Sequence, residues 1–240
     1  ISQDPTIEKF IHPYIGAEEF IKGKERWCFW LKGITPAELK SHKILYDIVC
    51  KVREFRLASR AKTTNGYAKV PHLFAQITQP EGKDYILVPR VSSENRVYIP
   101  IGFNTANVVA SDAVQIIPDA SLYHFGVLES SVHMAWMRMV CGRLESRYRY
   151  SKEIVYNNFP WPKVTEAQRA KIEATAQAIL DARRLYPDSS LADLYDDVTM
   201  PIELRKAHTA NDIAVLEAYG LPKSTAEPAI VAHLFTLTAH

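Results

Sequence analysis

The chain has 240 residues, 47% hydrophobic and 23% charged, with a formal net charge of +2. These fractions are typical of a soluble globular protein with one sizeable domain or two small ones. The apolar runs are too short to span a membrane and no signal-peptide pattern opens the chain, so we expect a cytoplasmic protein without a membrane partner. Cys28, Cys50 and Cys141 are odd in number and widely spaced, which fits a reducing compartment and gives no zinc-ligand spacing.

The first seventy residues are expected to combine a turn, a strand and a long helix. Residues 12–16 contain turn residues, and the aromatic run 26–31 is apolar enough for a buried strand. Thr35 followed by Pro36 is typical of a helix N-cap and its first helical position. We therefore expect a helix from Thr35 to about Ser59.

Residues 72–126 are expected to form short strands, because apolar and β-branched runs alternate there with turn residues. Prolines lie just beyond several of these runs, where they stop strands or mark sheet edges. The expected strands are 72–77, 85–89, 97–101, 108–110 and 114–117. Apolar residues at intervals of three and four then predict a helix over about 128–146.

The segment Phe159-Pro160-Trp161-Pro162 is stiff, because each proline fixes its own φ and keeps the preceding residue extended. Thr165 then offers a helix N-cap with Gln168 in capping-box position. The remaining pattern is helical, with Gly220 expected just beyond a helix end and separate helices expected over 200–208 and 210–219. The sequence thus predicts an α+β chain: a mixed α/β domain over residues 1–160 and a small all-helical domain over residues 161–240.

Charge is distributed unevenly between these parts. Residues 1–163 carry 22 Lys and Arg against 16 Asp and Glu, a balance of +6, whereas residues 164–240 carry 7 against 11, a balance of −4. A basic first part indicates a polyanionic partner. An ordinary solvated surface is the alternative that the charge count leaves open.

Two groups of basic residues are candidates for phosphate contacts. The first lies around the end of the helix expected at 35–59, where Glu54 is the only acid between residues 51 and 69. Cations there also interact favourably with the helix dipole, which is the structural alternative. The second follows Gly142, where arginine and tyrosine alternate. The predicted phosphate-binding residues are Lys51, Arg53, Arg56, Arg60, Lys62, Arg143, Arg147, Arg149 and Lys152.

The sequence contains no recognisable catalytic or metal-binding constellation. Its glycines lack the spacing of phosphate-binding loops, and G-x-S-x-G, H-E-x-x-H and C-x-x-C are absent. His124 and His133 are expected to be hydrogen-bonded structural residues. The E-x-K sequences at 38–40 and 81–83 match half of a nuclease site only as often as chance provides. We therefore predict no catalytic residue, no metal and no cofactor in this chain.

Several blocks of the sequence resemble one known family. They are PYIGAEEFIxGKxRWCxWL at 13–31, FRLAS at 55–59, PxVSSExRxYIP at 89–100, GF at 102–103, LYHFGVL at 122–128, SSxHMAW at 130–136, CGRL at 141–144, RYS at 149–151 and YNNFPWP at 156–162, where x marks a position outside the likeness. In this order they resemble the part that follows the methylase domain in type IIL, MmeI-like restriction-modification enzymes. The likeness covers most of residues 13–162 and extends to short pieces at 192–195 and 200–201.

The resemblance implies a division of labour. An upstream methylase domain of the same parent chain would bind S-adenosylmethionine and methylate the N6 of adenine. This chain would be the target recognition domain plus the helical C-terminal domain, with double-stranded DNA and the methylase domain as its partners. The chain starts at Ile1, so we expect it to be part of a longer protein, which would also carry any endonuclease.

Sequence reading by such a domain requires side chains that reach base edges in the major groove. Arginine suits guanine, asparagine suits adenine and glutamate accepts from cytosine, and the loop at 92–96 holds all three types. The segment 129–131, which opens a helix, is the second candidate. The predicted base-reading residues are Ser92, Ser93, Glu94, Asn95, Arg96, Glu129, Ser130 and Ser131, each with an ordinary solvated turn as the alternative.

A competing hypothesis is a protein-interaction or scaffolding module whose basic surface binds an acidic partner. DNA binding that is unaffected by joint substitution of Arg56, Arg60 and Lys62 would favour that module. The acidic helical tail is expected to pack against missing domains or to hold the recognition domain in place.

Overall fold

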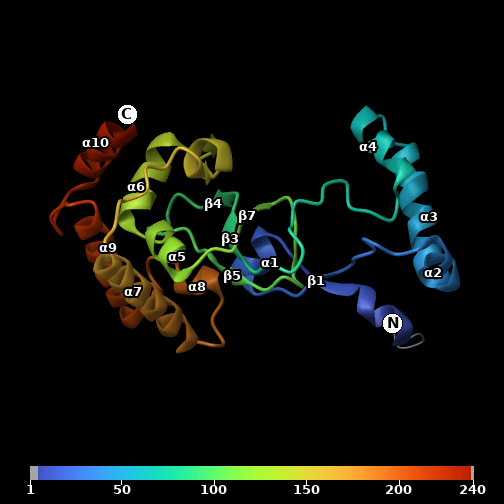
Figure 1. Ribbon diagram of the computed structural model, residues 1–240, viewed down its shortest axis with the longest axis horizontal. Coiled ribbons are helices and arrows are strands. Elements are labelled where there is room, and N and C mark those ends of the chain that lie inside the picture. The colour runs from blue at the N-terminus through green and yellow to red at the C-terminus, as the bar shows by residue number, and fades with distance from the viewer. Residues whose placement is uncertain (1–4, 239–240) are drawn as a thin grey trace.

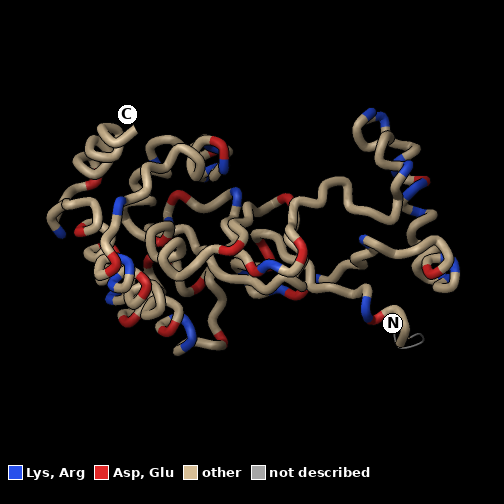
Figure 2. The backbone as a smooth tube through the Cα atoms, viewed as in Figure 1, with Lys and Arg blue, Asp and Glu red and all other residues tan. Residues whose placement is uncertain are grey.

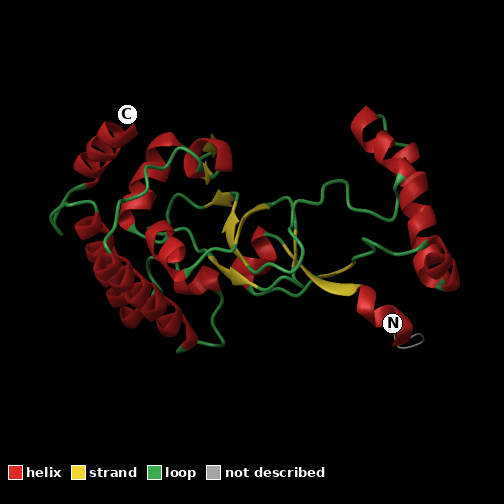
Figure 3. Ribbon diagram, in the orientation of Figure 1, coloured by secondary structure: helices red, strands yellow, loops and turns green. Residues whose placement is uncertain are grey.

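The computed structural model of the chain describes residues 5–238 and has three regions along its long axis (Figure 1). A helical arm lies at one end, small sheets lie in the middle and a group of packed helices lies at the other end, as the colouring by secondary structure also shows (Figure 3). The α+β architecture that the sequence predicts is confirmed. No helix within residues 5–238 combines the length and apolar character needed to cross a membrane.

The arm and its junction with the sheets are built from residues 5–69. Leu45 and Val49 of its longest helix pack with Ile7, Phe10 and Leu31 in a small core of their own. The elements are η1 (Pro5–Phe10), β1 (Ile11–Ile15), α1 (Ala17–Lys22), β2 (Trp27–Phe29), α2 (Pro36–Ser41), α3 (Lys43–Leu57), α4 (Lys62–Gly66) and η2 (Tyr67–Lys69).

Three details of the arm differ from the predictions. The expected turn at 12–16 is largely strand β1, which pairs with β2 on one side and with β6 (Val109–Ala110) on the other. The expected single helix is interrupted at His42, whose ψ of 89° leaves the helical region. The strand expected at 26–31 is present as β2, but Trp27 is 57% exposed rather than buried.

The central region consists of three-stranded sheets. In the first sheet, β1 lies between β2 and β6. In the second sheet, β3 (Tyr85–Pro89) pairs antiparallel with β5 (Gly102–Asn104) and with β7 (Val114–Pro118). In the third, β9 (Arg147–Arg149) lies between β4 (Val91–Ser92) and β8 (Gly142–Leu144). The strand expected at 72–77 does not form, because these residues pair with no strand of the described chain; Phe74 packs its ring on Tyr14 and Trp30. The strand expected at 97–101 does not form either, and the Ile101 N–H and carbonyl bond to the side chains of Glu129 and Arg183.

The helical region follows the predicted caps closely. The Gln168 N–H donates to Thr165 Oγ1 at 3.2 Å and the Thr165 N–H donates to Gln168 Oε1 at 2.9 Å, so the predicted capping box is confirmed. Gly220 has a φ of 71° just after a helix end, as expected. The helices are α5 (Leu122–Leu128), α6 (Ser131–Val140), a π-helical turn η3 (Lys152–Tyr156), α7 (Glu166–Arg184), α8 (Leu191–Leu194), α9 (Ile202–Ala218) and α10 (Glu227–Thr238).

Two helix predictions in this region are wrong in extent. The helix expected to reach residue 146 ends at Val140, and the chain then forms the β8–β9 hairpin. The two helices expected at 200–208 and 210–219 are the single helix α9, because nothing in Thr209-Ala210 breaks the backbone hydrogen bonding.

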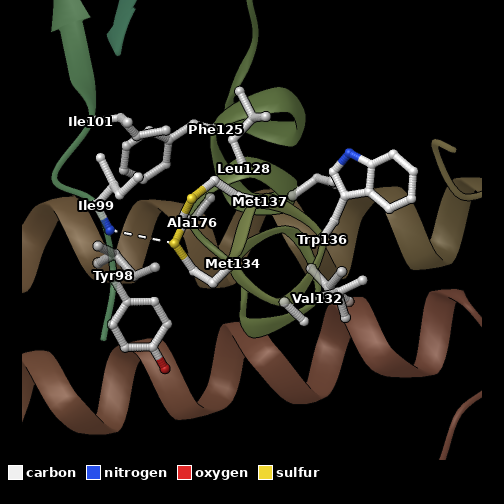
Figure 4. Packing of buried hydrophobic residues seen from close by; sticks show 14 of the residues in the cluster. Tyr98, Ile99, Ile101, Phe125, Leu128, Val132, Met134, Trp136, Met137 and Ala176 are labelled. Atoms are coloured by element: carbon white, nitrogen blue, oxygen red, sulfur yellow. Dashed lines mark hydrogen bonds between the residues drawn. The ribbon is translucent and has the colours of Figure 1, made fainter. Parts of the chain in front are cut away.

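One hydrophobic core runs through both the sheet-bearing and the helical parts. Phe159, in the stiff segment between them, is buried in a cluster that includes Ile86 on one side and Ile172 and Leu234 on the other. Met134, Met137 and Phe125 lie in the same cluster beside Ala176 of α7 (Figure 4). The core therefore continues across residue 160, and the predicted division of the chain at that residue stays a prediction.

Candidate nucleic-acid interface

The β4–β9–β8 sheet brings the predicted base-reading loop, residues 92–96 (the reading loop), beside the basic residues that follow Gly142. Val91 and Ser92 of β4 pair with Arg149 and Tyr148 of β9, and the loop 93–96 follows β4 directly. Both strands of the β8–β9 hairpin carry arginines that are exposed. Two segments that are fifty residues apart in the sequence thus form one polar surface.

The hairpin keeps its arginines ordered and solvent-exposed. The guanidinium of Arg143 lies 4.1 Å from the ring centroid of Tyr148, which is buried beneath it, so the charge is positioned by cation–π contact. Arg147 Nη2 donates to Glu145 Oε2 at 3.0 Å at the turn of the hairpin, where Glu145 has a φ of 57°. The alternation of arginine and tyrosine over 147–150 is the period-two pattern of a half-buried strand, and would have revealed this hairpin in the sequence.

The reading loop forms a tight turn, and its acidic residue, Glu94, interacts with the hairpin. The N–H of Asn95 donates to Ser93 Oγ at 3.2 Å and the N–H of Arg96 donates to Ser93 O at 3.3 Å. A hydrogen bond from Ser146, aided by Arg143 and Arg147, lowers the pKa of Glu94. The loop and the hairpin are therefore linked through their side chains as well as through the sheet.

Two members of the loop are not freely available. Ser92 is buried, and its hydroxyl has no hydrogen-bond partner among residues 5–238. Arg96 is half-buried, and burial lowers its pKa while Asp196, just after α8, opposes that shift. Asn95 is exposed, and Ser93 and Glu94 are partly exposed. These last three are the loop side chains best placed to reach a ligand.

The prediction that residues 129–131 read bases is wrong for Glu129 and Ser130. Glu129 and Ser130 are 0% exposed, so neither can reach a base while the core is intact. Glu129 Oε1 accepts hydrogen bonds from Arg183 Nη2 at 2.7 Å and from the Ile101 N–H at 3.0 Å. Ser130 is the N-cap of α6, accepting from the His133 N–H at 3.3 Å.

Ser131 begins α6 and is partly exposed, and its N–H donates to Asp212 Oδ1 at 2.7 Å. The buried ion pair explains why 129–131 could not be judged from local sequence: the partner of Glu129 is 54 residues away.

The first basic cluster lies on the arm, on α3 and just after it, far along the long axis from the helical region (Figures 1 and 2). Arg56 has a structural role, because its guanidinium donates to the carbonyls of Tyr67, Val70 and Leu73 at 2.8–3.1 Å. The exposed members of the predicted set are Lys51, Arg53, Arg60 and Lys62 on the arm, and Arg143, Arg147, Arg149 and Lys152 at the hairpin and η3.

The histidines expected to be structural are hydrogen-bonded. His133 Nε2 lies 3.0 Å from the Tyr150 hydroxyl, and burial lowers the pKa of His133 to about 3, so it is neutral. His124 Nδ1 accepts from the Ser121 N–H at the start of α5. Across residues 5–238, no group of three or more His, Cys, Asp or Glu is placed to hold a metal ion.

Comparison with known families accounts for the whole chain. Residues 1–163 match the model of the MmeI target recognition domain, and residues 164–240 match the model of the MmeI C-terminal domain. The chain belongs to the MmeI family. The resemblance drawn from the sequence blocks is thereby confirmed, and both the arm and the β4–β9–β8 sheet lie in the part matched by the MmeI target recognition domain.

Individual proteins agree with the MmeI assignment. DNA methyltransferase A of Bacillus subtilis (strain 168) is 38% identical over 219 residues, which are 91% of this chain and 25% of that protein. The solved structure of the type IIL restriction-modification enzyme MmeI in complex with DNA is 47% identical with a TM-score of 0.95, and the match covers 100% of this chain and 32% of that one. The chain thus spans a quarter to a third of the length of these relatives.

Proposed function

We propose that this chain recognises a specific sequence of double-stranded DNA for an S-adenosylmethionine-dependent N6-adenine methyltransferase of a restriction-modification system. The observation that carries the proposal is the β4–β9–β8 sheet, which joins a loop of Glu, Asn and Arg to an exposed arginine hairpin. The names of the relatives support it, since one is a DNA methyltransferase and the other is a restriction-modification enzyme bound to DNA.

The two kinds of side chain on this surface suit two separate tasks. Arginines contact phosphates and fix the register of the protein on the duplex, but they carry no sequence information when used in that way. A two-stranded ribbon such as β8–β9 has the width that the major groove of B-DNA admits. The neighbouring loop then offers Glu94 and Asn95 to base edges, where a good pair discriminates by about 1–3 kcal/mol.

The arm supplies a second phosphate contact at a distance from the hairpin. Lys51, Arg53, Arg60 and Lys62 are exposed there. A methylase must extrude its target adenine from the stack, and two separated contacts hold the flanking duplex during that step. The methylase domain, its S-adenosylmethionine and any endonuclease would belong to other parts of the parent protein, which we place in the cytoplasm with no membrane partner.

The proposal is tested by the salt dependence of duplex binding. Fluorescence anisotropy of a mixed-sequence 30-base-pair duplex is measured over a salt titration, and the log–log slope falls by about 0.9 for each phosphate contact removed. A hairpin variant with Arg143, Arg147 and Arg149 changed to Ala, and an arm variant with Arg53, Arg60 and Lys62 changed to Ala, should each lower the slope.

The matched control removes the same charge from the helical region by changing Arg184, Lys206 and Lys223 to Ala, all of which are exposed. The control should retain the wild-type slope. If the hairpin variant binds like this control, the hairpin does not contact DNA. If the wild-type chain binds no duplex even at low salt, the protein-interaction module becomes the better hypothesis for this chain.

A further inference from the structure

The segment that follows the reading loop is buried without belonging to a sheet. Tyr98, Ile99 and Ile101 are each 9% exposed or less, yet residues 97–101 have no strand partner. Buried backbone groups need hydrogen-bond partners from elsewhere in such a case. The Ile99 N–H donates to Met134 Sδ at 3.4 Å (Figure 4), and the Ile101 N–H donates to Glu129 Oε1 at 3.0 Å.

Residues from three helices of the C-terminal part hold this segment, two directly and one through Arg138 of α6. From α9, Asp212 Oδ2 accepts from the Tyr98 hydroxyl at 2.6 Å. From α7, Arg183 Nη1 donates to Ile101 O at 2.6 Å. From α10, Glu227 forms a bidentate pair with Arg138, whose Nη1 donates to Val97 O at 3.3 Å. The helical part thus helps to fix the path of 97–101.

The Tyr98–Asp212 contact is the direct anchor from the C-terminal part that lies nearest to the loop. The Tyr98 ring stacks on His208 of α9 with centroids 4.0 Å apart and an interplanar angle of 25°, so both ends of the side chain are fixed. Tyr98 follows Arg96 by two residues, about 7 Å of extended chain. So short a link transmits a displacement of Tyr98 to the loop.

We infer that the C-terminal helical domain positions the reading loop on the DNA-facing hairpin, with Asp212 as the positioning residue that acts through Tyr98. One end of the loop is fixed to the hairpin by β4, and the other end is fixed to α9 by this contact. The inference rests on the proposed function. It says that residues that do not contact DNA control how accurately the loop is placed against base edges. Recognition requires reading groups held within about 0.5 Å of their productive position.

Three substitutions separate this role from general stability. Tyr98→Phe removes only the hydroxyl, and Asp212→Ala removes the acceptor for both Tyr98 and the Ser131 N–H. Asp212→Asn retains both bonds, because its amide oxygen accepts from Ser131 and its NH₂ donates to the tyrosine oxygen. Tyr219→Phe is the matched control: Tyr219 is 8% exposed, like Tyr98 at 9%, and its hydroxyl donates to Pro160 O at 2.8 Å, away from the loop.

The first measurement needs no DNA. Hydrogen–deuterium exchange is followed at the amides of Asn95 and Arg96, which are hydrogen-bonded within the loop. Tyr98→Phe and Asp212→Ala should accelerate their exchange several-fold, whereas Asp212→Asn and Tyr219→Phe should leave it at the wild-type rate. Unchanged exchange in Tyr98→Phe would overturn the inference whatever the chain does with DNA.

The second measurement is selection from a randomised duplex library, with the affinity for a mixed-sequence duplex measured alongside. Tyr98→Phe should lower the preference for the selected sequence by about tenfold, the scale of one mismatched base pair, while the mixed-sequence affinity stays within about twofold. A wild-type chain that selects no sequence refutes the proposed function. A wild-type chain that does select, with a Tyr98→Phe variant that selects equally well, refutes the positioning role alone.

Discussion

Replacement of Arg183 by methionine should destabilise this protein far more than the same change at the adjacent residue. The side chain of Arg183 is 10% exposed and that of its partner Glu129 is 0% exposed. Arg183 also donates to Ile101 O and, through Nε, to the Tyr195 hydroxyl at 2.8 Å. Methionine retains the apolar stem and the helix propensity of arginine but none of these hydrogen bonds.

The magnitude follows from what the substitution leaves behind. Removing one partner of a buried ion pair costs about 3–5 kcal/mol, because the other charge stays buried without compensation. Arg184→Met is the control, since Arg184 is 71% exposed and its pair with Asp181 is a surface pair worth no more than about 1 kcal/mol. Both positions lie in the last turn of α7, so helix propensity cancels in the comparison.

The destabilisation by Arg183→Met should also shrink as the pH falls. Burial raises the pKa of Glu129, and Arg183 opposes that shift, so removing Arg183 raises the pKa further. A carboxyl whose pKa is higher in the folded than in the unfolded state takes up a proton on folding, which stabilises the fold increasingly as pH falls through the folded pKa. The loss should therefore be larger at pH 8 than at pH 5.

Urea unfolding followed by far-ultraviolet circular dichroism, at both pH values, measures these differences. The double variant Arg183→Met with Glu129→Gln should recover part of the stability at pH 8, because the stranded charge is gone. If the free energy of unfolding of Arg183→Met lies within about 1 kcal/mol of that of Arg184→Met at pH 8, the Arg183–Glu129 ion pair does not stabilise the interface.

Two further predictions concern packing and the arm. Gly126→Ala should lower the free energy of unfolding, measured by calorimetry, by about 1–3 kcal/mol, because the added Cβ would lie 2.7 Å from Ile172 Cγ2. Gly142→Ala is the control, since the nearest neighbour of a Cβ there is 4.0 Å away. Arg56→Ala should speed proteolytic cleavage after α3, because Arg56 bonds the carbonyls of Tyr67 and Leu73, and it should not change the salt slope of DNA binding. Arg53 is exposed on the same helix, so Arg53→Ala should lower that slope by about 0.9 and leave cleavage unchanged.

The parts of the fold that could be predicted from sequence are those decided within a few residues. The capping box at Thr165 and the left-handed Gly220 depend on backbone groups within one helical turn. Strand β1 was missed because it contains Pro13 and because one of its partners, β6, is almost a hundred residues away. Its existence depends on pairing that no local pattern encodes.

The candidate site shows the same limit in its side chains. Residue type alone identifies the loop at 92–96 as a candidate. Its position beside the hairpin depends on the pairing of β4 with β9. Glu129 looks like a polar residue at a helix start, and only Arg183, from another part of the chain, makes its burial possible. Residues 97–101 have the composition of a strand, but their backbone bonds to side chains that lie between 28 and 82 residues away, such as Glu129 and Arg183, rather than to a neighbouring strand.

The acidic balance of residues 164–240 has a different meaning once these contacts are known. Asp212 and Glu227 face the recognition part, where they accept hydrogen bonds from Tyr98 and Arg138. Asp196 lies near Arg96 and partly offsets the effect of its burial. The charge of Glu227 is offset by Arg138 in a bidentate pair. The balance of −4 therefore reflects in part how the helical region fixes the segment that follows the reading loop.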